Sequence, residues 1–182
     1  MRNPLSRIAF RTTGHIHRNR STLGGMRRSL PPVASKVSDT LIARGHHGVI
    51  LTQPQPTPTA ADAAQALGVD IGAITKSLVF LLDDDPVLLL VSGAHTVHLE
   101  RTGQRLDGAL TRAPAAMVRQ VTGQPVGGVA PVGHPINLPT FIDNALGSYS
   151  ELWAAGGHPN TVFRTTFGEL IRITAGLAID VD

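Results

Sequence analysis

Residues 74–91 read ITKSLVFLLDDDPVLLLV, in which two apolar runs enclose a short acidic segment. The runs are rich in leucine and valine, and the DDDP segment at 83–86 contains residue types that favour turns. This pattern predicts a β-hairpin with strands at residues 74–82 and 87–91. Because both runs are hydrophobic almost without interruption, we expect the hairpin to be buried on both faces.

Shorter periodic segments surround the hairpin. Apolar residues at helical spacing, followed by glycine, predict helices at residues 36–44 and 59–68, the second capped by Thr59 with Asp62 three positions later. Further helices are expected at 97–110, 113–121 and 167–174, and strands at 49–51, 140–142, 152–155, 161–164 and 177–181. With no internal repeat, the predicted fold class is one mixed α/β domain, whose central, mostly antiparallel or mixed sheet is flanked by helices.

Charge is distributed unevenly along the 182 residues. Residues 1–38 contain eight basic and no acidic residues, whereas the remainder contains eight basic and 13 acidic residues, a net charge of −5. Residues 1–32, which end in Pro31-Pro32, are predicted to be a basic, disordered extension, and residues 33–182 the folded domain. The alternative for the extension is a nucleic-acid-binding or organelle-targeting segment, because it is rich in arginine and lacks acids.

The composition and motifs exclude several classes of protein. The chain has no cysteine, which excludes disulfides, thiolate zinc sites and a cysteine nucleophile. No run approaches the ~18 uninterrupted apolar residues of a membrane span, and no signal-peptide core is present, so we expect a soluble, cytoplasmic protein. No G-x-S-x-G elbow is present, which argues against a serine hydrolase. His95-x-x-His98 lacks the glutamate of a zinc-protease helix, and neither a metal nor a cofactor is expected.

Lys76 is the most informative single side chain. The chain has 14 arginines but only two lysines, and Lys76 lies near the start of a strongly apolar strand. A flexible ammonium at that position can bind a carboxylate, a phosphate or a carbonyl oxygen. The alternative is a lysine at a strand end whose ammonium reaches water along the protein surface.

A glycine-rich segment, GGVAP at 127–131, is the second candidate. Its backbone N–H groups could form a cradle for an anion or a carbonyl oxygen, although an ordinary turn is the alternative. Asp143 either pairs with a cation such as Lys76 or caps the turn at Asn144. His134 and His158 each lie beside a Gly/Pro turn and are candidates for the rim of a cleft.

Taken together, these segments resemble the YbaK/ProX family of aminoacyl-tRNA deacylases, the free-standing relatives of the prolyl-tRNA synthetase editing domain. The resemblance extends over roughly residues 49–181. It rests on the order and spacing of TAADAAQALG at 59–68, ITKSLVF at 74–80, TG at 122–123, GGVAPVG at 127–133, LPTFID at 138–143 and AAGGHPN at 154–160.

The resemblance implies hydrolysis of the ester that joins an incorrect amino acid, cysteine or another small residue, to tRNA. The attacking group would be water aided by the terminal tRNA hydroxyl, or the thiol of a cysteinyl substrate. Lys76 maps to the family's best-known site residue and is the expected catalytic residue. The expected substrate-binding residues are Thr59, Gly127, Gly128, Val129, Pro131, Asp143, Gly156, Gly157 and His158.

The expected partners are aminoacyl-tRNA and an aminoacyl-tRNA synthetase. Since a domain of net charge −5 is poorly suited to binding phosphates, three sources of affinity are open. Arg101, Arg105, Arg112 and Arg119 gather on one face, the basic extension contributes, or a synthetase delivers the tRNA; of these, the arginine cluster is the favoured hypothesis. The alternative function is a non-catalytic module that binds a tRNA acceptor end or a small ligand, because a fold does not guarantee an activity.

Overall fold

The computed structural model describes residues 30–57 and 59–182. The predicted extension at 1–32 therefore lies almost entirely outside the described residues. Helix α1 (Pro32–Ala43) begins one residue before the predicted start of the domain. Pro32 occupies the first helical position, where its fixed φ angle suits a helix and its missing N–H costs no hydrogen bond.

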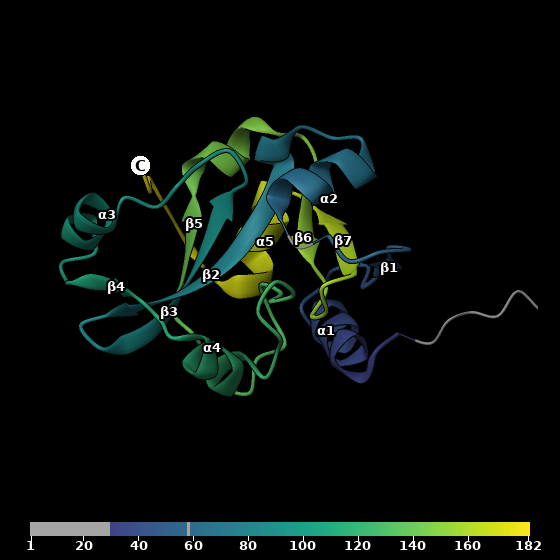
Figure 1. Ribbon diagram of the computed structural model, residues 1–182, viewed down its shortest axis with the longest axis horizontal. Helices are drawn as coiled ribbons and strands as arrows, with labels where there is room; N and C mark the ends of the chain where they lie inside the picture. The colour runs from purple at the N-terminus through teal and green to yellow at the C-terminus, as the bar shows by residue number, and fades with distance from the viewer. Residues whose placement is uncertain (1–29, 58) are drawn as a thin grey trace, which may run out of the picture.

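The described residues form a mixed α/β fold around one sheet, as predicted (Figure 1). The strand order is β1-β7-β6-β2-β3-β5-β8, and β4 also pairs with β2. The pairs β1–β7, β6–β7, β2–β3 and β2–β4 are antiparallel, whereas β2–β6, β3–β5 and β5–β8 are parallel. The strands are β1 (Leu51–Thr52), β2 (Ile74–Leu82), β3 (Asp85–Ser92), β4 (Leu110–Arg112), β5 (Thr140–Asp143), β6 (Leu152–Ala155), β7 (Thr161–Thr165) and β8 (Leu177–Ile179).

The predicted hairpin is present as β2 and β3, whose register runs without interruption from Thr75↔Ser92 to Leu82↔Asp85. Its predicted burial on both faces is correct for β3, where residues 87–92 are all buried. It is wrong for the middle of β2, where Lys76, Ser77 and Leu78 are only half-buried. The cause is an interruption in the sheet beside these residues, described below.

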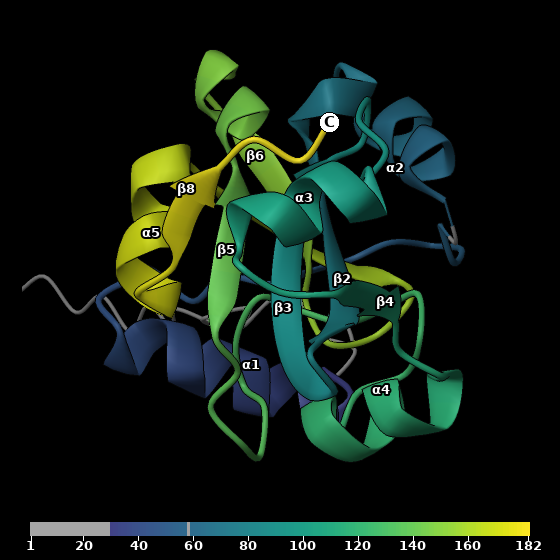
Figure 2. The same cartoon turned by 90° about the vertical axis from the view of Figure 1, so that its left-hand side faces the viewer.

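Helices cover both faces of the sheet (Figure 2). Side chains of α1 and α5 (Phe167–Thr174) pack with those of β2, β3 and β5 in the larger core, which includes Val37, Val79 and Leu170. On the other face Phe80, Leu89 and Val97 form a second core beneath α3 (Leu99–Arg105). α2 (Ala60–Leu67) packs on Ile74 through a third, smaller cluster.

The prediction of one helix over residues 97–110 is wrong. Only α3 is helical there, and Leu110–Arg112 is the strand β4, which pairs with the end of β2. The chain turns at Asp107-Gly108, where Asp107 takes a positive φ of 54°, and Leu110 then fills the second core. α4 (Ala115–Thr122) begins after Pro114, close to the predicted helix at 113–121. None of the helices in the described part of the chain is long and apolar enough to cross a membrane.

Candidate active site

An interruption in the sheet creates the site. Along its edge opposite β3, β2 pairs with β6 only at Ile74 and Thr75, and with β4 only at residues 80–82. Residues 76–79 therefore have β3 as their single strand neighbour. β6 ends at Ala155, before a turn in which Gly156 donates its N–H to Thr161 O and Gly157 takes a φ of 96°. On the other side Pro114 ends the pairing of β4, since proline has no N–H to continue a ladder.

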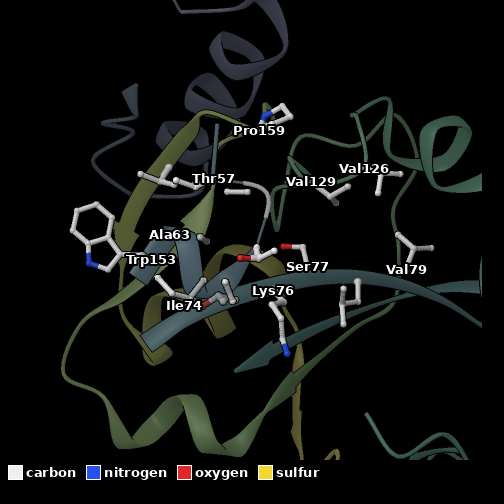
Figure 3. Close-up of a pocket in the computed structure, with 18 of the residues that line it drawn as sticks. Thr57, Ala63, Ile74, Lys76, Ser77, Val79, Val126, Val129, Trp153 and Pro159 are labelled. Atoms are coloured by element: carbon white, nitrogen blue, oxygen red, sulfur yellow. The ribbon is translucent and has the colours of Figure 1, made fainter. Parts of the chain in front are cut away.

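A cavity of about 570 Å³ opens at this interruption (Figure 3). Its walls are mostly small and apolar, and they come from β2, α2, the start of α4, β6 and the loop after α4. The lining includes Thr59, Ala63, Ile74, Lys76, Ser77, Val79, Arg112, Ala113, Val118, Val126, Gly127, Val129, Trp153, Ala155, Pro159 and Thr161. Of the expected site residues, the structure thus brings together Thr59, Lys76, Gly127 and Val129.

The alternation of β2 separates Lys76 from the glycine-rich loop. Figure 3 shows the Ser77 side chain on the side of β2 that faces Val129, whereas the Lys76 side chain leaves the strand on the opposite side. The cores agree, because Val79 and Val129 share the larger core while Phe80 belongs to the other. Lys76 therefore lies beside the cavity, but its ammonium does not face the loop.

The Lys76 ammonium is held by the turn after β3. Nζ donates to Gly93 O at 3.4 Å and to His95 O. Partial burial lowers the pKa of Lys76, and the negative charge of Asp143 opposes that shift. An ammonium has three donors, so these two carbonyl oxygens leave it one further donor.

Asp143 follows the second of its two expected roles. It is 1% exposed, and its carboxylate accepts from Ala145 N at 3.0 Å, which caps the 3₁₀ turn at Asn144–Ser148, and from Ser92 N at 3.0 Å. The nearest cationic candidate is His95, whose Nδ1 lies 3.1 Å from Asp143 Oδ2. Asp143 thus contributes to the environment of Lys76 but does not itself line the cavity.

The glycine-rich loop is fixed from beneath by Gln124, whose residue is 2% exposed. The side-chain amide of Gln124 donates to Val132 O at 3.1 Å and accepts from Ala130 N at 2.6 Å. Gly128 N donates to Pro125 O. Within the described residues, the N–H groups of Gly127 and Val129 have no hydrogen-bond partner, and these are the two loop residues that line the cavity. The predicted cradle therefore reduces to two amides.

The turn at residues 156–160 packs against the glycine-rich loop at 127–131. A Cβ on Gly128 would lie 2.6 Å from the His158 carbonyl carbon and 2.7 Å from Pro159 N, so the two loops touch through their backbones. The imidazole of His158 is held by Asn160, and the neighbouring Pro159 reaches the cavity. Pro131, Gly156, Gly157 and His158 themselves lie outside the lining.

Several features were not found by sequence reasoning. Thr75 Oγ1 and Ser77 Oγ are buried polar atoms that lack a hydrogen-bond partner in the described structure. The two hydroxyls belong to strand residues that line the cavity, one on each side of Lys76 in sequence. The alternation in Thr75-Lys76-Ser77 was the available signal, because it places both hydroxyls on the face opposite the lysine. Nothing local in the sequence distinguished Gln124.

Comparison with known proteins identifies the family. A family model described as the aminoacyl-tRNA editing domain matches residues 54–173, more than half of the chain. The chain belongs to this family. A solved structure described as a candidate trans-editing enzyme for prolyl-tRNA synthetase is 41% identical, with a TM-score of 0.80, over 85% of this chain and 99% of that one.

Curated relatives of two kinds match this editing domain. The uncharacterized protein YwhH of Bacillus subtilis (strain 168) is 29% identical over 114 residues, which are 62% of this chain and 72% of YwhH. The proline–tRNA ligase of Listeria welshimeri is 32% identical over 88 residues, which are 47% of this chain and 15% of the ligase. The chain thus matches only a small part of the ligase.

Proposed function

We propose that this editing domain hydrolyses the ester between a small amino acid and the terminal ribose of tRNA, in the cavity at the interruption of the sheet. The observation that carries the proposal is the pair of amides at Gly127 and Val129, which have no hydrogen-bond partner among the described residues and belong to two residues that line this cavity. Two fixed N–H donors beside a small apolar pocket are suited to an acyl carbonyl that gains negative charge.

The chemistry needs little beyond orientation. An aminoacyl ester is already activated, so holding the carbonyl and a water molecule in line supplies much of the acceleration. The water oxygen forms a bond to the carbonyl carbon, whose oxygen becomes an oxyanion bound by the Gly127 and Val129 amides. The bond to the ribose oxygen then breaks, and a proton from the water ends on that oxygen. The products are the free amino acid and tRNA.

The walls of the cavity suit an uncharged acyl side chain. Ala63, Ala113, Ala155, Val79 and Val129 contribute only apolar groups to the lining. An extra methylene changes binding in such a pocket by only about 1–3 kcal/mol, so we expect alanine, serine and cysteine esters to overlap as substrates. The likeness to prolyl-tRNA synthetase relatives supports proline tRNA as the carrier.

For Lys76 we propose a positioning role. By binding Gly93 O and His95 O, its ammonium ties the turn after β3 to the strand whose edge borders the cavity. Its remaining donor is the group that would contact a phosphate or carbonyl oxygen of the substrate. Kinetic measurements can distinguish contact with the substrate from positioning of the strand. Loss of a tRNA contact raises KM, whereas loosening of the strand lowers kcat.

The proposal is tested with proline tRNA charged with alanine, serine or cysteine. Wild type is expected to deacylate at least one of them, and Lys76→Ala to lower kcat/KM at least tenfold while remaining folded. Lys36→Ala, which changes the other lysine on the exposed side of α1, is the matched control and should leave the rate unchanged. Absence of hydrolysis with all three substrates would overturn the proposal and favour the non-catalytic binding module.

A further inference from the structure

The interrupted edge of β2 presents main-chain groups to the cavity. Gly93 N donates to Ile74 O, so the backbone groups of Ile74 face β3. At the other end Asp83 N donates to Ala109 O, which places the groups of Asp83 on the β4 side. Backbone direction alternates along an antiparallel strand, and the register of β2 on β3 has no interruption. The N–H and C=O of Ser77 and Val79 therefore point away from β3, into the interval that neither β6 nor β4 fills.

Such groups need a partner. Buried backbone N–H and C=O groups are nearly always hydrogen-bonded, to protein, water or a ligand. Beside them, the Ser77 hydroxyl is buried and lacks a partner among the described residues, and Figure 3 shows the Ser77 side chain on the side of β2 that faces Val129. In the described structure three polar groups without a hydrogen-bond partner thus belong to one residue of a cavity whose walls are otherwise mostly apolar.

An aminoacyl ester has the polar atoms of one strand residue. Its α-ammonium is a donor and its ester carbonyl is an acceptor, joined through one Cα as in the backbone of a peptide. In an antiparallel sheet, every second pair of facing residues exchanges both hydrogen bonds, and the outward-facing N–H and C=O of Ser77 offer such a pair. A single residue can therefore be read by an open strand edge in the way that longer peptides add to a sheet.

We propose that the edge of β2 at Ser77 binds the aminoacyl group as if it were an added strand residue. Ser77 C=O accepts from the α-ammonium, and Ser77 N–H donates to the ester carbonyl. That carbonyl oxygen has a second lone pair, which one of the loop amides of Gly127 and Val129 binds, and the oxyanion formed on attack has a further lone pair for the other. This inference rests on the proposed function and assigns the part of the substrate that the edge recognises: an unblocked α-amino acid, whatever its small side chain.

The experiment follows individual amides by NMR hydrogen exchange. The probe is alanine joined through an amide to 3′-amino-3′-deoxyadenosine, which resists hydrolysis, and its control is the propionyl compound, which lacks only the α-amino group. In the free protein Ser77 N–H should exchange at least tenfold faster than those of Lys76 and Leu78, which face β3. The alanyl probe should slow the exchange of Ser77 at least tenfold and leave Lys76 and Leu78 unchanged, and the propionyl compound should bind at least tenfold more weakly.

The outcomes separate the two proposals. If wild type deacylates tRNA and the alanyl probe binds without protecting Ser77, the inference about the edge is overturned and the proposed function stands. Equal binding of the alanyl and propionyl compounds would also overturn it, because the α-ammonium would then have no partner. If no substrate is deacylated and neither compound binds, both proposals are overturned. Ser77→Ala keeps the main-chain groups and is expected to retain the protection of residue 77 by the alanyl probe.

Discussion

Gly128 lies where two loops touch through their backbones. A Cβ at this position would meet three backbone atoms of His158 and Pro159 at 2.6–2.8 Å, and backbone atoms cannot rotate away as the end of a side chain can. Gly128→Ala is therefore expected to lower the free energy of unfolding by about 1–3 kcal/mol, the usual cost of overpacking. It should also abolish most deacylation, because the neighbouring amides of Gly127 and Val129 would shift. Urea unfolding and the deacylation assay measure the two effects.

The matched control for this variant is Gly168→Ala in α5. A Cβ on Gly168 would meet no atom within 4 Å, so stability should be unchanged or higher by up to about 1 kcal/mol, since alanine favours a helix. Equal stability losses for the two variants would contradict the packing argument.

Some residues of the site could be predicted from sequence because their chemistry is local. The capping box of Thr59 and Asp62 needs only a spacing of three, and the structure confirms it. Lys76 was predicted to lie at the site and is among the residues that line the cavity, yet the direction of its ammonium depends on the turn at Gly93–His95, 17 to 19 residues away. Gln124 was not predicted for a similar reason, because its two partners, Val132 O and Ala130 N, are brought to it only by the folding of the loop.

At the scale of elements, the segment between α4 and β5 is held by Gln124 and by His134, whose Nε2 lies 2.8 Å from Ala130 O. Burial lowers the pKa of His134 below its usual 6.5, and burial likewise lowers that of His46. Below about pH 6.5 the unfolded chain therefore binds protons that the folded protein resists, so stability is complete above that pH and falls as the pH decreases. The free energy of unfolding should be smaller at pH 5.5 than at pH 7.5.

His134→Gln tests the contribution of this segment. Glutamine can still donate to Ala130 O but does not titrate, so urea unfolding of the variant should show less loss of stability between pH 7.5 and 5.5 than wild type. An identical loss in both proteins would mean that His134 does not contribute to the acid sensitivity.

The hairpin was predicted from a long pattern, whereas the short strand β4 was missed within a predicted helix. The hairpin of β2 and β3 has 18 residues of consistent pattern, and its register followed. β4 has three residues, and the sequence around it, with Leu99, Gly103 and Leu106, is equally compatible with a helix. Pairing with Phe80–Leu82 decides in favour of a strand, and that partner lies about 30 residues earlier in the chain.

At the scale of the whole molecule, the distribution of arginines bears on which part of the chain contacts tRNA phosphates. Seven of the 14 arginines lie within residues 1–29, outside the described structure. Of the four arginines predicted to gather on one face, Arg105 is occupied by the carbonyl oxygens of Asp180 and Asp182, whereas Arg112 lines the cavity. The basic segment is thus a strong candidate for the phosphate contacts of tRNA.

Removal of residues 1–29 should accordingly weaken tRNA binding and make it less dependent on salt. Each phosphate contact contributes about 0.7–0.9 to the slope of log affinity against log salt concentration, so the loss of several contacts is readily measured by fluorescence titration. Hydrolysis of a small aminoacyl-adenosine should remain unchanged, since the cavity is intact. Equal slopes for the full-length and shortened chains would assign the phosphate contacts to residues 30–182.

The interruption in the sheet has a consequence for which substitutions this protein can accept at residue 77. If main-chain atoms at residue 77 hold the amino acid, a hydroxyl at that position is not required, and any side chain small enough to leave the cavity open preserves the contact. Proline is an exception, because it has no N–H to donate. A library in which every residue is tried at position 77 should therefore accept alanine, glycine and threonine, and reject proline together with the large side chains that would fill the cavity.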